Sequence, residues 1–287
     1  MTEPISPILS HYQTRSLADP LAPAQMPLSL DLGLTTTSVT RYNLGWKLPD
    51  GQTLTFSHIE RINSQDTSCF KFVEEELIKV EAFSEYTNRY YSLMPTPKAP
   101  TMLISGIPMH RIKGTTPVDD THQKIQALGR PYGSILDTAT GLGYTAIQAA
   151  KTTQHVITVE FDPVVLSICR VNPWSQELFN NPSITQIVGD TWDIAALFPD
   201  ASLNAIIHDP PTFSLAGHLY SKSLYETFFR ILKEKGRLFH YIGDPDSRSG
   251  ATIGRGVVDR LKQSGFEVMP KAAAFGVLAK KTSLRLP

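Results

Sequence analysis

The sequence has few cysteines, no excess of either charge and no long uninterrupted apolar run. Its 287 residues include two cysteines, Cys69 and Cys169, too few for a disulfide scaffold or a four-cysteine zinc site. Lysine plus arginine number 27, as do aspartate plus glutamate, so the formal net charge is zero. This balance excludes a protein that binds nucleic acid by bulk positive charge, but it allows a local basic patch.

The sequence also lacks signals for secretion or membrane insertion. No uncharged apolar run reaches the roughly 20 residues that span a bilayer. The first residues, MTEPISPILSHYQTRS, have no positive region leading into an apolar one. The low cysteine content fits a reducing compartment. We therefore expect a cytoplasmic protein without a signal peptide or a membrane partner.

Composition divides the chain into three segments. Five prolines within residues 1–27 predict an irregular leader. Residues 28–100 contain short stretches rich in β-branched and aromatic residues, and Pro49-Asp50-Gly51 predicts a hairpin turn between two of them. We expect a small β-rich domain there and a larger domain over residues 101–287.

Strand and helix patterns alternate about five times in the larger domain, which predicts a parallel sheet with helices on both faces. The helix before the first strand should start at Asp119 or Asp120 as N-cap, and an amphipathic helix over 219–236 should end at Gly236. The last two strand patterns, FEVMP and AFGVLAKK, have no helix between them and should pair antiparallel. The expected class is α/β, a Rossmann-like, doubly wound, seven-stranded sheet with a reversed last strand.

Ligands of such sheets bind at the carboxyl ends of the strands. The first strand ends at Asp137 and is followed by Gly141 and Gly143, which allow a tight turn and close approach of the backbone to a ligand. The second ends at Glu160, where a carboxylate can accept hydrogen bonds from the ribose hydroxyls of an adenosine cofactor. Alternatively, the turn binds nothing and Glu160 is a surface acid at the start of the next helix.

Two further strand ends carry acids. Asp190 follows the third strand and is placed to accept from an adenine amino group, to cap the next helix, or to do both. The fourth strand ends in Asp209-Pro210-Pro211, with Phe213 just beyond. The prolines fix the backbone, Asp209 and the Pro210 carbonyl can accept from a planar amino group, and an aromatic ring can stack on it. Alternatively, the double proline only ends the strand.

These four strand ends resemble the class I S-adenosylmethionine-dependent methyltransferases, over roughly residues 107–287. The resemblance implies S-adenosyl-L-methionine as the cofactor and a cofactor site made of Asp137, Thr138, Gly141, Gly143, Tyr144, Glu160, Asp190 and Thr191. It implies a catalytic loop made of Asp209, Pro210, Pro211 and Phe213. The amino-methylating branch usually has an aromatic residue directly after the prolines, where this chain has Thr212. Longer strings, such as DTATGLGYTAIQAA and HDPPTFSLAGHLY, resemble a little-studied group of predicted methyltransferases seen mainly in archaea.

The resemblance implies methyl transfer to nitrogen of a planar group, with an RNA base as the first candidate. RNA would need a basic patch, for which the candidates are Arg111, Lys113, Lys124, Arg130, Lys271, Lys280, Lys281 and Arg285. The histidines at 110, 208 and 240 are expected to line the sheet edge as polar groups, without a metal.

Three other classes of function remain open. Aminopropyltransferases that make polyamines share the fold and an N-terminal β-rich domain, but they typically have a second aspartate where this chain has Thr212. NAD-dependent oxidoreductases fit Glu160 but do not need Asp-Pro-Pro. A binding module without catalysis would not need Glu160 and Asp209 intact.

Overall fold

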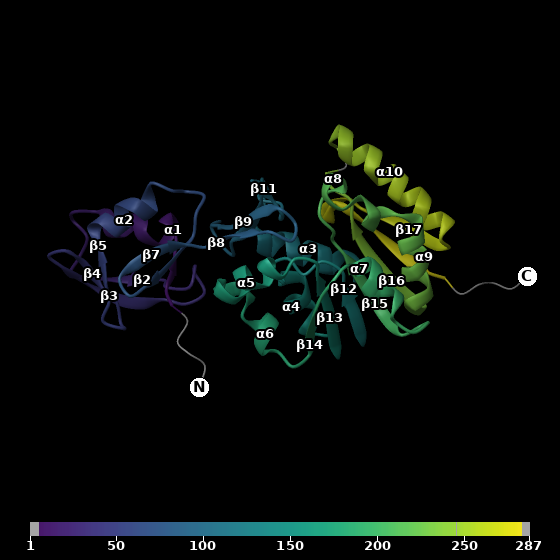
Figure 1. Cartoon of the computed structure of the whole chain (residues 1–287), viewed down its shortest axis with the longest axis horizontal. Helices are drawn as coiled ribbons and strands as arrows, with labels where there is room; N and C mark the ends of the chain where they lie inside the picture. Colours follow the sequence, from purple (N-terminus) through teal and green to yellow (C-terminus); the bar gives the residue numbers. More distant parts are fainter. Residues whose placement is uncertain (1–5, 245, 283–287) are drawn as a thin grey trace, which may run out of the picture. The chain divides into compact units, whose positions relative to one another are not determined.

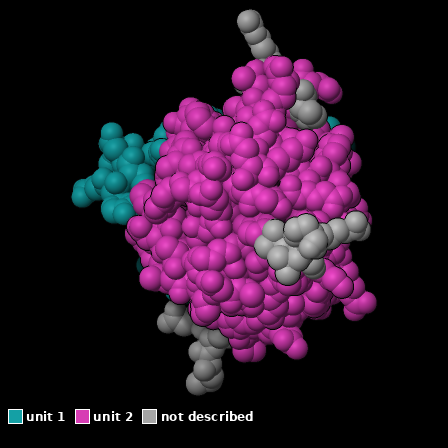
Figure 2. Space-filling view, turned by 90° about the vertical axis from the view of Figure 1, so that its right-hand side faces the viewer, with its two compact units in different colours: residues 1–118, 164–176 teal, residues 119–163, 177–287 magenta. Residues whose placement is uncertain are grey.

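The structure, a computed structural model, describes residues 6–244 and 246–282 (Figure 1). The chain forms two compact units, coloured separately in Figure 2. Unit 1 comprises residues 1–118 and 164–176, and unit 2 comprises residues 119–163 and 177–287.

Small antiparallel sheets make up unit 1, in the strand orders β1-β6-β7, β2-β3-β4-β5 and β11-β10-β9-β8. The strands are β1 (Ile8–Leu9), β2 (Gln25–Leu28), β3 (Thr37–Tyr42), β4 (Gly45–Lys47), β5 (Thr53–Thr55), β6 (Phe70–Val73), β7 (Glu76–Lys79), β8 (Glu81–Ser84), β9 (Arg89–Met94), β10 (Thr101–Ile104) and β11 (Ile107–Pro108). The helices of this unit include α1 (His11–Thr14), α2 (Phe56–Asn63) and α5 (Pro163–Val171). β4 pairs with β5 across the turn at Pro49-Asp50-Gly51, which confirms the predicted hairpin.

The leader expected to be irregular contains secondary structure over its described part. Ser10 caps α1 in a capping box, because its backbone N–H donates to Gln13 Oε1 while its hydroxyl accepts from the first turn. Leu9 and Leu17 are fully buried in a core with Trp46 and Phe70. These apolar contacts hold the segment despite its prolines. Residues 1–5 of the expected leader lie outside the described residues.

Residues 101–118 group with unit 1, unlike the domain boundary expected at residue 100. β10 pairs antiparallel with β9 and returns through Ser105-Gly106 to β11. Both turn residues have positive φ, 47° and 87°, as a tight hairpin turn requires. Because β10 pairs with β9, the prolines between these two strands lie in a loop within one sheet. They do not mark the boundary between unit 1 and unit 2.

A seven-stranded sheet forms the centre of unit 2, in the order β14-β13-β12-β15-β16-β18-β17. Its strands are β12 (Ser134–Asp137), β13 (His155–Glu160), β14 (Ile184–Val188), β15 (Leu203–His208), β16 (Leu232–Tyr241), β17 (Phe266–Lys271) and β18 (Gly276–Lys281). The pairs from β14 to β16 are parallel, and β18 runs antiparallel to both β16 and β17. The sheet confirms the predicted α/β class, with its reversed last strand.

Helices flank this sheet (Figure 1). They include α3 (Pro117–Leu128), α4 (Tyr144–Ala150), α6 (Glu177–Asn180), α7 (Thr191–Ala196), α8 (Phe213–Ala216), α9 (Lys222–Ile231) and α10 (Arg248–Gln263). Apolar faces of α9 and α10 pack on the sheet in a core that includes Phe228, Leu238 and Leu261.

Two helix limits differ from those predicted. α3 starts at Pro117, a residue whose fixed φ suits the first helical position, and not at Asp119 or Asp120. α9 ends at Ile231, and the residues expected to continue it to Gly236 begin β16, where Leu232 already pairs with Leu203. The parallel pairing with β15 outweighs the helix propensity of the Lys-Glu-Lys stretch.

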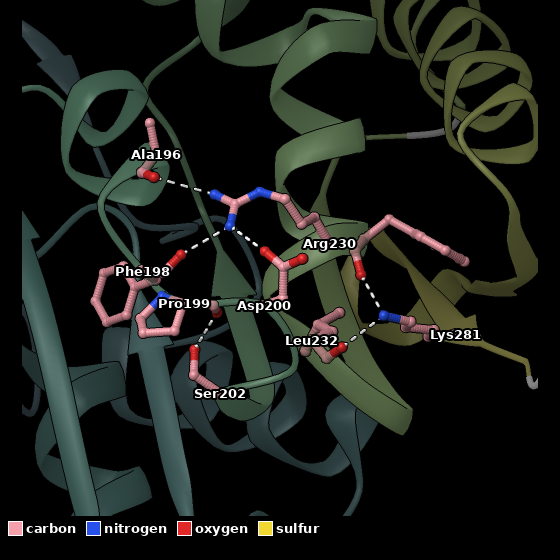
Figure 3. A network of polar contacts seen from close by, with 9 residues as sticks. Ala196, Phe198, Pro199, Asp200, Ser202, Arg230, Leu232 and Lys281 are labelled. Atoms are coloured by element: carbon pink, nitrogen blue, oxygen red, sulfur yellow. Dashed lines mark hydrogen bonds and ion pairs between the residues drawn. The ribbon is translucent and has the colours of Figure 1, made fainter.

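Basic side chains complete two helix ends of unit 2 (Figure 3). Arg230 donates to the carbonyls of Ala196 and Phe198 after α7 and forms an ion pair with Asp200. Lys281 Nζ donates to the carbonyls of Phe229 and Leu232, each at 2.8 Å. Lys281 therefore binds the carbonyls at the C-terminal end of α9, where the helix dipole favours cations.

Candidate active site

Asp137 lies at the carboxyl end of β12 and is fully buried. Its Oδ2 accepts hydrogen bonds from the hydroxyls of Thr145 and Thr158, at 3.1 and 3.0 Å. Its Oδ1 is buried without a hydrogen-bond partner among the described residues. Burial raises the pKa of Asp137 to about 8, against the two threonine hydroxyls, which lower it. This buried acceptor at the strand end can accept a hydrogen bond from a water molecule or from a ligand.

Glu160 ends the neighbouring strand β13 and faces the glycine loop. Its Oε2 accepts from the Gly141 amide at 2.9 Å, and its Oε1 accepts from the Asp162 amide at 3.1 Å. Burial raises the pKa of Glu160 to about 7, while these two amides lower it. The structure therefore joins the predicted glycine loop and the predicted ribose acid directly, and Glu160 is not a surface acid.

The glycine loop needs its glycines. Gly141 and Gly143 have φ of 51° and 77°, in the left-handed region that disfavours side chains. A Cβ at Gly143 would lie 2.9 Å from a methyl carbon of Leu178, on α6. The loop leads into α4, where Tyr144, also predicted for this site, is 8% exposed.

Asp190 and Thr191 lie at the end of β14, where α7 begins. Asp190 caps this helix by accepting from the Trp192 amide at 2.8 Å, as predicted, and its Oδ2 lies within hydrogen-bond distance of His218 Nε2, at 3.0 Å. The hydroxyl of Thr191 donates to the carbonyl of Thr138 at 2.5 Å. Thr191 therefore ties the third strand end to the first.

The loop after β15 is held from two sides. Asp209 Oδ2 accepts from Lys124 Nζ at 2.5 Å, and the same ammonium lies 2.8 Å from Asp120 Oδ2. The Pro211 carbonyl accepts from the Tyr220 hydroxyl at 2.9 Å. Phe213, 48% exposed, begins α8, and its ring meets Tyr220 edge to face with centroids 5.4 Å apart.

Two predicted lining histidines lie behind this loop. His208 and His240 are fully buried on adjacent strands, with ring centroids 4.4 Å apart. His208 Nε2 is 2.8 Å from the Leu219 carbonyl, which can only accept, so Nδ1 accepts from the Thr138 hydroxyl at 2.6 Å. Burial lowers the pKa of His208 to about 4. These rings are therefore neutral and support the strand ends, while His110 belongs to unit 1 and pairs with Thr101.

Sequence reasoning missed the residues that position the acids. Lys124 was counted as a basic surface residue, yet its side chain is 2% exposed and bound to two carboxylates. Thr145 and Tyr220 lie in the strings quoted above but were given no role, and Thr158 lies in none of them. The available signal was the Asp120–Lys124 spacing of four residues on one helix, which also fits an exposed ion pair.

The described part of unit 2 forms a Rossmann-like α/β unit with acids at four strand ends. Two solved structures share this fold. The spermidine synthase from Thermotoga maritima matches with a TM-score of 0.55 and 17% identity, over 74% of this chain and 75% of that chain. A spermidine synthase in complex with the transition state analogue AdoDATO matches with a TM-score of 0.54 and 16% identity, over 74% and 75%.

At the level of sequence, no family model matches the chain. The chain is 40% identical over 281 residues to "Uncharacterized protein MJ1233" from Methanocaldococcus jannaschii, covering 94% of this chain and 96% of that protein. The chain therefore belongs to the family of that archaeal protein. In the segments that the structure describes, none of the helices is long and apolar enough to cross a membrane.

Proposed function

We propose that the chain is an S-adenosylmethionine-dependent methyltransferase that methylates a nitrogen atom of a planar substrate group. The observation that carries this proposal is the set of acids on adjacent strand ends of unit 2. Asp137 and Glu160 are buried beside a glycine loop, and Asp209 lies in an Asp-Pro-Pro loop on the strand next to Asp137. A cationic sulfonium cofactor suits these acids better than NAD, whose pyrophosphate is anionic.

The residues present fit such a cofactor. The orphaned Asp137 Oδ1 can accept from its amino group, and Glu160 can accept from its ribose hydroxyls. Asp190 and the loop from Gly141 to Gly143 complete the proposed site, with Thr138, Tyr144 and Thr191 supporting it. When bound, the cofactor supplies an electrophilic methyl group on sulfur.

The chain's own residues orient the acceptor. Asp209 would accept a hydrogen bond from the substrate N–H and stabilise the positive charge that develops on nitrogen. Tyr220 fixes the Pro211 carbonyl and thereby the shape of the loop. Phe213 is exposed enough to stack on a planar ring. Alignment of the two reactants provides most of the rate enhancement.

An RNA base offers a planar amine, but RNA would also need a basic surface patch. Two of the cations proposed for that patch make contacts within the protein instead. Lys124 is buried and Lys281 is bound to carbonyls, while Arg285 lies outside the described residues. A smaller substrate with a planar amine is therefore an equal candidate.

Aminopropyl transfer is the second candidate, because both of the solved structures compared above are spermidine synthases. A transfer assay separates the candidates when it compares S-adenosylmethionine, labelled in its methyl group, with decarboxylated S-adenosylmethionine, labelled in its aminopropyl group. The acceptors are fractionated RNA, protein and small molecules from a lysate. Label from the methyl group alone supports methyl transfer, and label from the aminopropyl group alone replaces it with the second candidate.

Asp209→Asn tests the proposed catalytic loop. We expect methyl transfer to be abolished while the dissociation constant of S-adenosylhomocysteine changes by less than about threefold, because the residue faces the acceptor. Asp259→Asn, an exposed acid on α10, is the matched control and should retain activity. An equal loss of transfer and of cofactor affinity would move Asp209 into the cofactor site.

A further inference from the structure

Lys124 is the residue of unit 2 whose burial and charge the proposed function leaves unexplained. It extends from α3, and its Nζ contacts Asp209 Oδ2 at 2.5 Å and Asp120 Oδ2 at 2.8 Å. The ammonium also lies 4.6 Å from the ring centroid of Tyr241, at the end of β16. The side chains of Lys124 and Asp120 are 2% and 0% exposed, whereas that of Asp209 is 19% exposed.

We propose that Lys124 is a positioning residue that holds Asp209 in one rotamer, as an ionised carboxylate turned toward the acceptor amine. This proposal rests on the proposed function and deepens it. Asp120 anchors the ammonium from inside the unit, and Asp209 is the partner that reaches the more open side. The three side chains thus form a rigid chain of contacts from α3 to the Asp-Pro-Pro loop.

A purely structural role explains this arrangement less well. Buried ion pairs contribute little net stability, because desolvation offsets the attraction, and an apolar side chain of similar volume often serves as well. One carboxylate, that of Asp120, would already neutralise the ammonium. The second contact is therefore directed at a specific residue, the one that the Asp-Pro-Pro motif marks.

The ion cluster also defines the type of acceptor. Burial works against the charge of Lys124, but the carboxylates of Asp209 and Asp120 outweigh it and keep the pKa of this ammonium above its usual value. A carboxylate bound to a permanent cation accepts a hydrogen bond well but takes up a proton poorly. Such an Asp209 suits an amine that is already neutral, such as an exocyclic amine on an aromatic ring, and not an alkylammonium ion.

In the resulting reaction, the lone pair of the amine nitrogen forms the new N–C bond, and the S–C bond breaks with its electron pair remaining on sulfur. The N–H proton is released to water afterwards. Asp209 keeps its hydrogen bond to the N–H throughout and does not need to become protonated.

The test uses two variants of the full chain. The double variant Asp120→Asn/Lys124→Met removes the cation yet keeps the net charge of the three side chains at −1, because a carboxylate and an ammonium are lost together. Asp120→Asn alone retains the contact between Lys124 and Asp209 and serves as the matched control. Circular dichroism and the S-adenosylhomocysteine dissociation constant establish that both variants are folded.

We expect kcat/KM for the acceptor, measured with S-adenosylmethionine saturating at every pH, to be independent of pH between 6 and 8 in the wild type and in Asp120→Asn. In the double variant it should fall at least about a hundredfold at pH 7, as expected for a misplaced reactive group. It should also decline toward acid pH, because Asp209 without the neighbouring cation takes up protons more readily. A double variant with the pH profile of the wild type and the kcat of Asp120→Asn would overturn the proposal.

A second measurement needs no activity and separates this proposal from the proposed function. The carboxyl carbon of Asp209, labelled with carbon-13 and assigned with Asp209→Asn, reports its ionisation by NMR. We expect no titration step between pH 5 and 9 in the wild type and a step within that range in the double variant. A step in the wild type would refute the positioning role, even if methyl transfer is observed. Absence of the wild-type step without any transfer activity would instead count against the proposed function alone.

Discussion

Binding of S-adenosylhomocysteine should depend on pH through Glu160. Burial raises the pKa of this carboxyl to about 7, although the Gly141 and Asp162 amides donate to it. Ribose hydroxyls bind the ionised form, so affinity is highest above pH 7 and decreases as the pH falls through 7. S-adenosylhomocysteine has no charge on sulfur and therefore isolates this effect from attraction of a sulfonium.

The expected magnitude follows from that pKa of about 7. About nine-tenths of Glu160 is protonated at pH 6 and about one-tenth at pH 8, so ionisation of Glu160 alone should make the dissociation constant about tenfold larger at pH 6 than at pH 8, a contribution of about 1.4 kcal/mol. Glu160→Gln should remove this contribution. A residual slope of the same sign should persist in the variant, because burial also raises the pKa of Asp137, to about 8.

Isothermal titration calorimetry in two buffers of different ionisation enthalpy measures the dissociation constant and the protons released. At pH 7, Glu160 should release about half a proton per ligand bound. Glu226→Gln, an exposed acid on α9, is the matched control and should behave as the wild type. The reasoning fails if Glu160→Gln and the wild type show the same ratio of dissociation constants between pH 6 and pH 8.

Three further predictions concern stability and loop shape. Gly143→Ala should destabilise the protein more than Gly51→Ala and should weaken binding of S-adenosylhomocysteine. Both glycines have positive φ, but only a Cβ at Gly143 meets another residue, Leu178 at 2.9 Å. Equal decreases in the free energy of unfolding, measured in urea, would contradict this. Lys281→Met should lower the free energy of unfolding by about 1–2 kcal/mol, because two hydrogen bonds to carbonyls are lost, and the melting temperature should fall by about 2–4 °C per kcal/mol. An equal fall in melting temperature in Lys280→Met would refute a specific role of Lys281 at the end of α9. The folded-state pKa of His208, about 4, lies below the usual value of 6.5, so its contribution to stability is present above pH 6.5 and is lost as the pH falls through about 4. The stability difference between wild type and His208→Gln should therefore shrink by about 2 kcal/mol from pH 7.5 to pH 5 in urea titrations, and a constant difference would refute the lowered pKa.

The sequence predicted the sheet and the strand ends because both follow from local patterns. Asp137 and Glu160 each end a strand, Asp190 and Asp209 follow one within two residues, and the carboxyl ends of parallel strands meet at one edge. That these residues bind a cofactor and an acceptor stays a prediction. No hairpin was predicted at Ser105-Gly106, which lies beyond the domain boundary expected at residue 100.

The missed features depend on partners distant in sequence. Lys124 and Asp209 are 85 residues apart, and nothing in the surroundings of Lys124 signals that its charge is buried. Strand β16 begins five residues before Arg237 because β15 offers it hydrogen bonds, which the helix pattern of 219–236 does not reveal. Prediction was therefore limited where pairing across the sheet overrides local preference.

The support given to each acid distinguishes the two halves of the proposed site. Hydroxyls hold Asp137 and amides hold Glu160, and burial raises the pKa of both. The two carboxyl groups stabilise the folded state most at pH values below their pKa in the unfolded chain. This contribution to stability is lost as the pH rises through about 7 for Glu160 and about 8 for Asp137. A cationic ligand that stabilises their ionised forms would offset this loss. Asp209, in contrast, already has a cation in Lys124. On the proposed function, acids held by neutral donors suit a positively charged cofactor, and the acid bound to an ammonium suits a neutral acceptor amine.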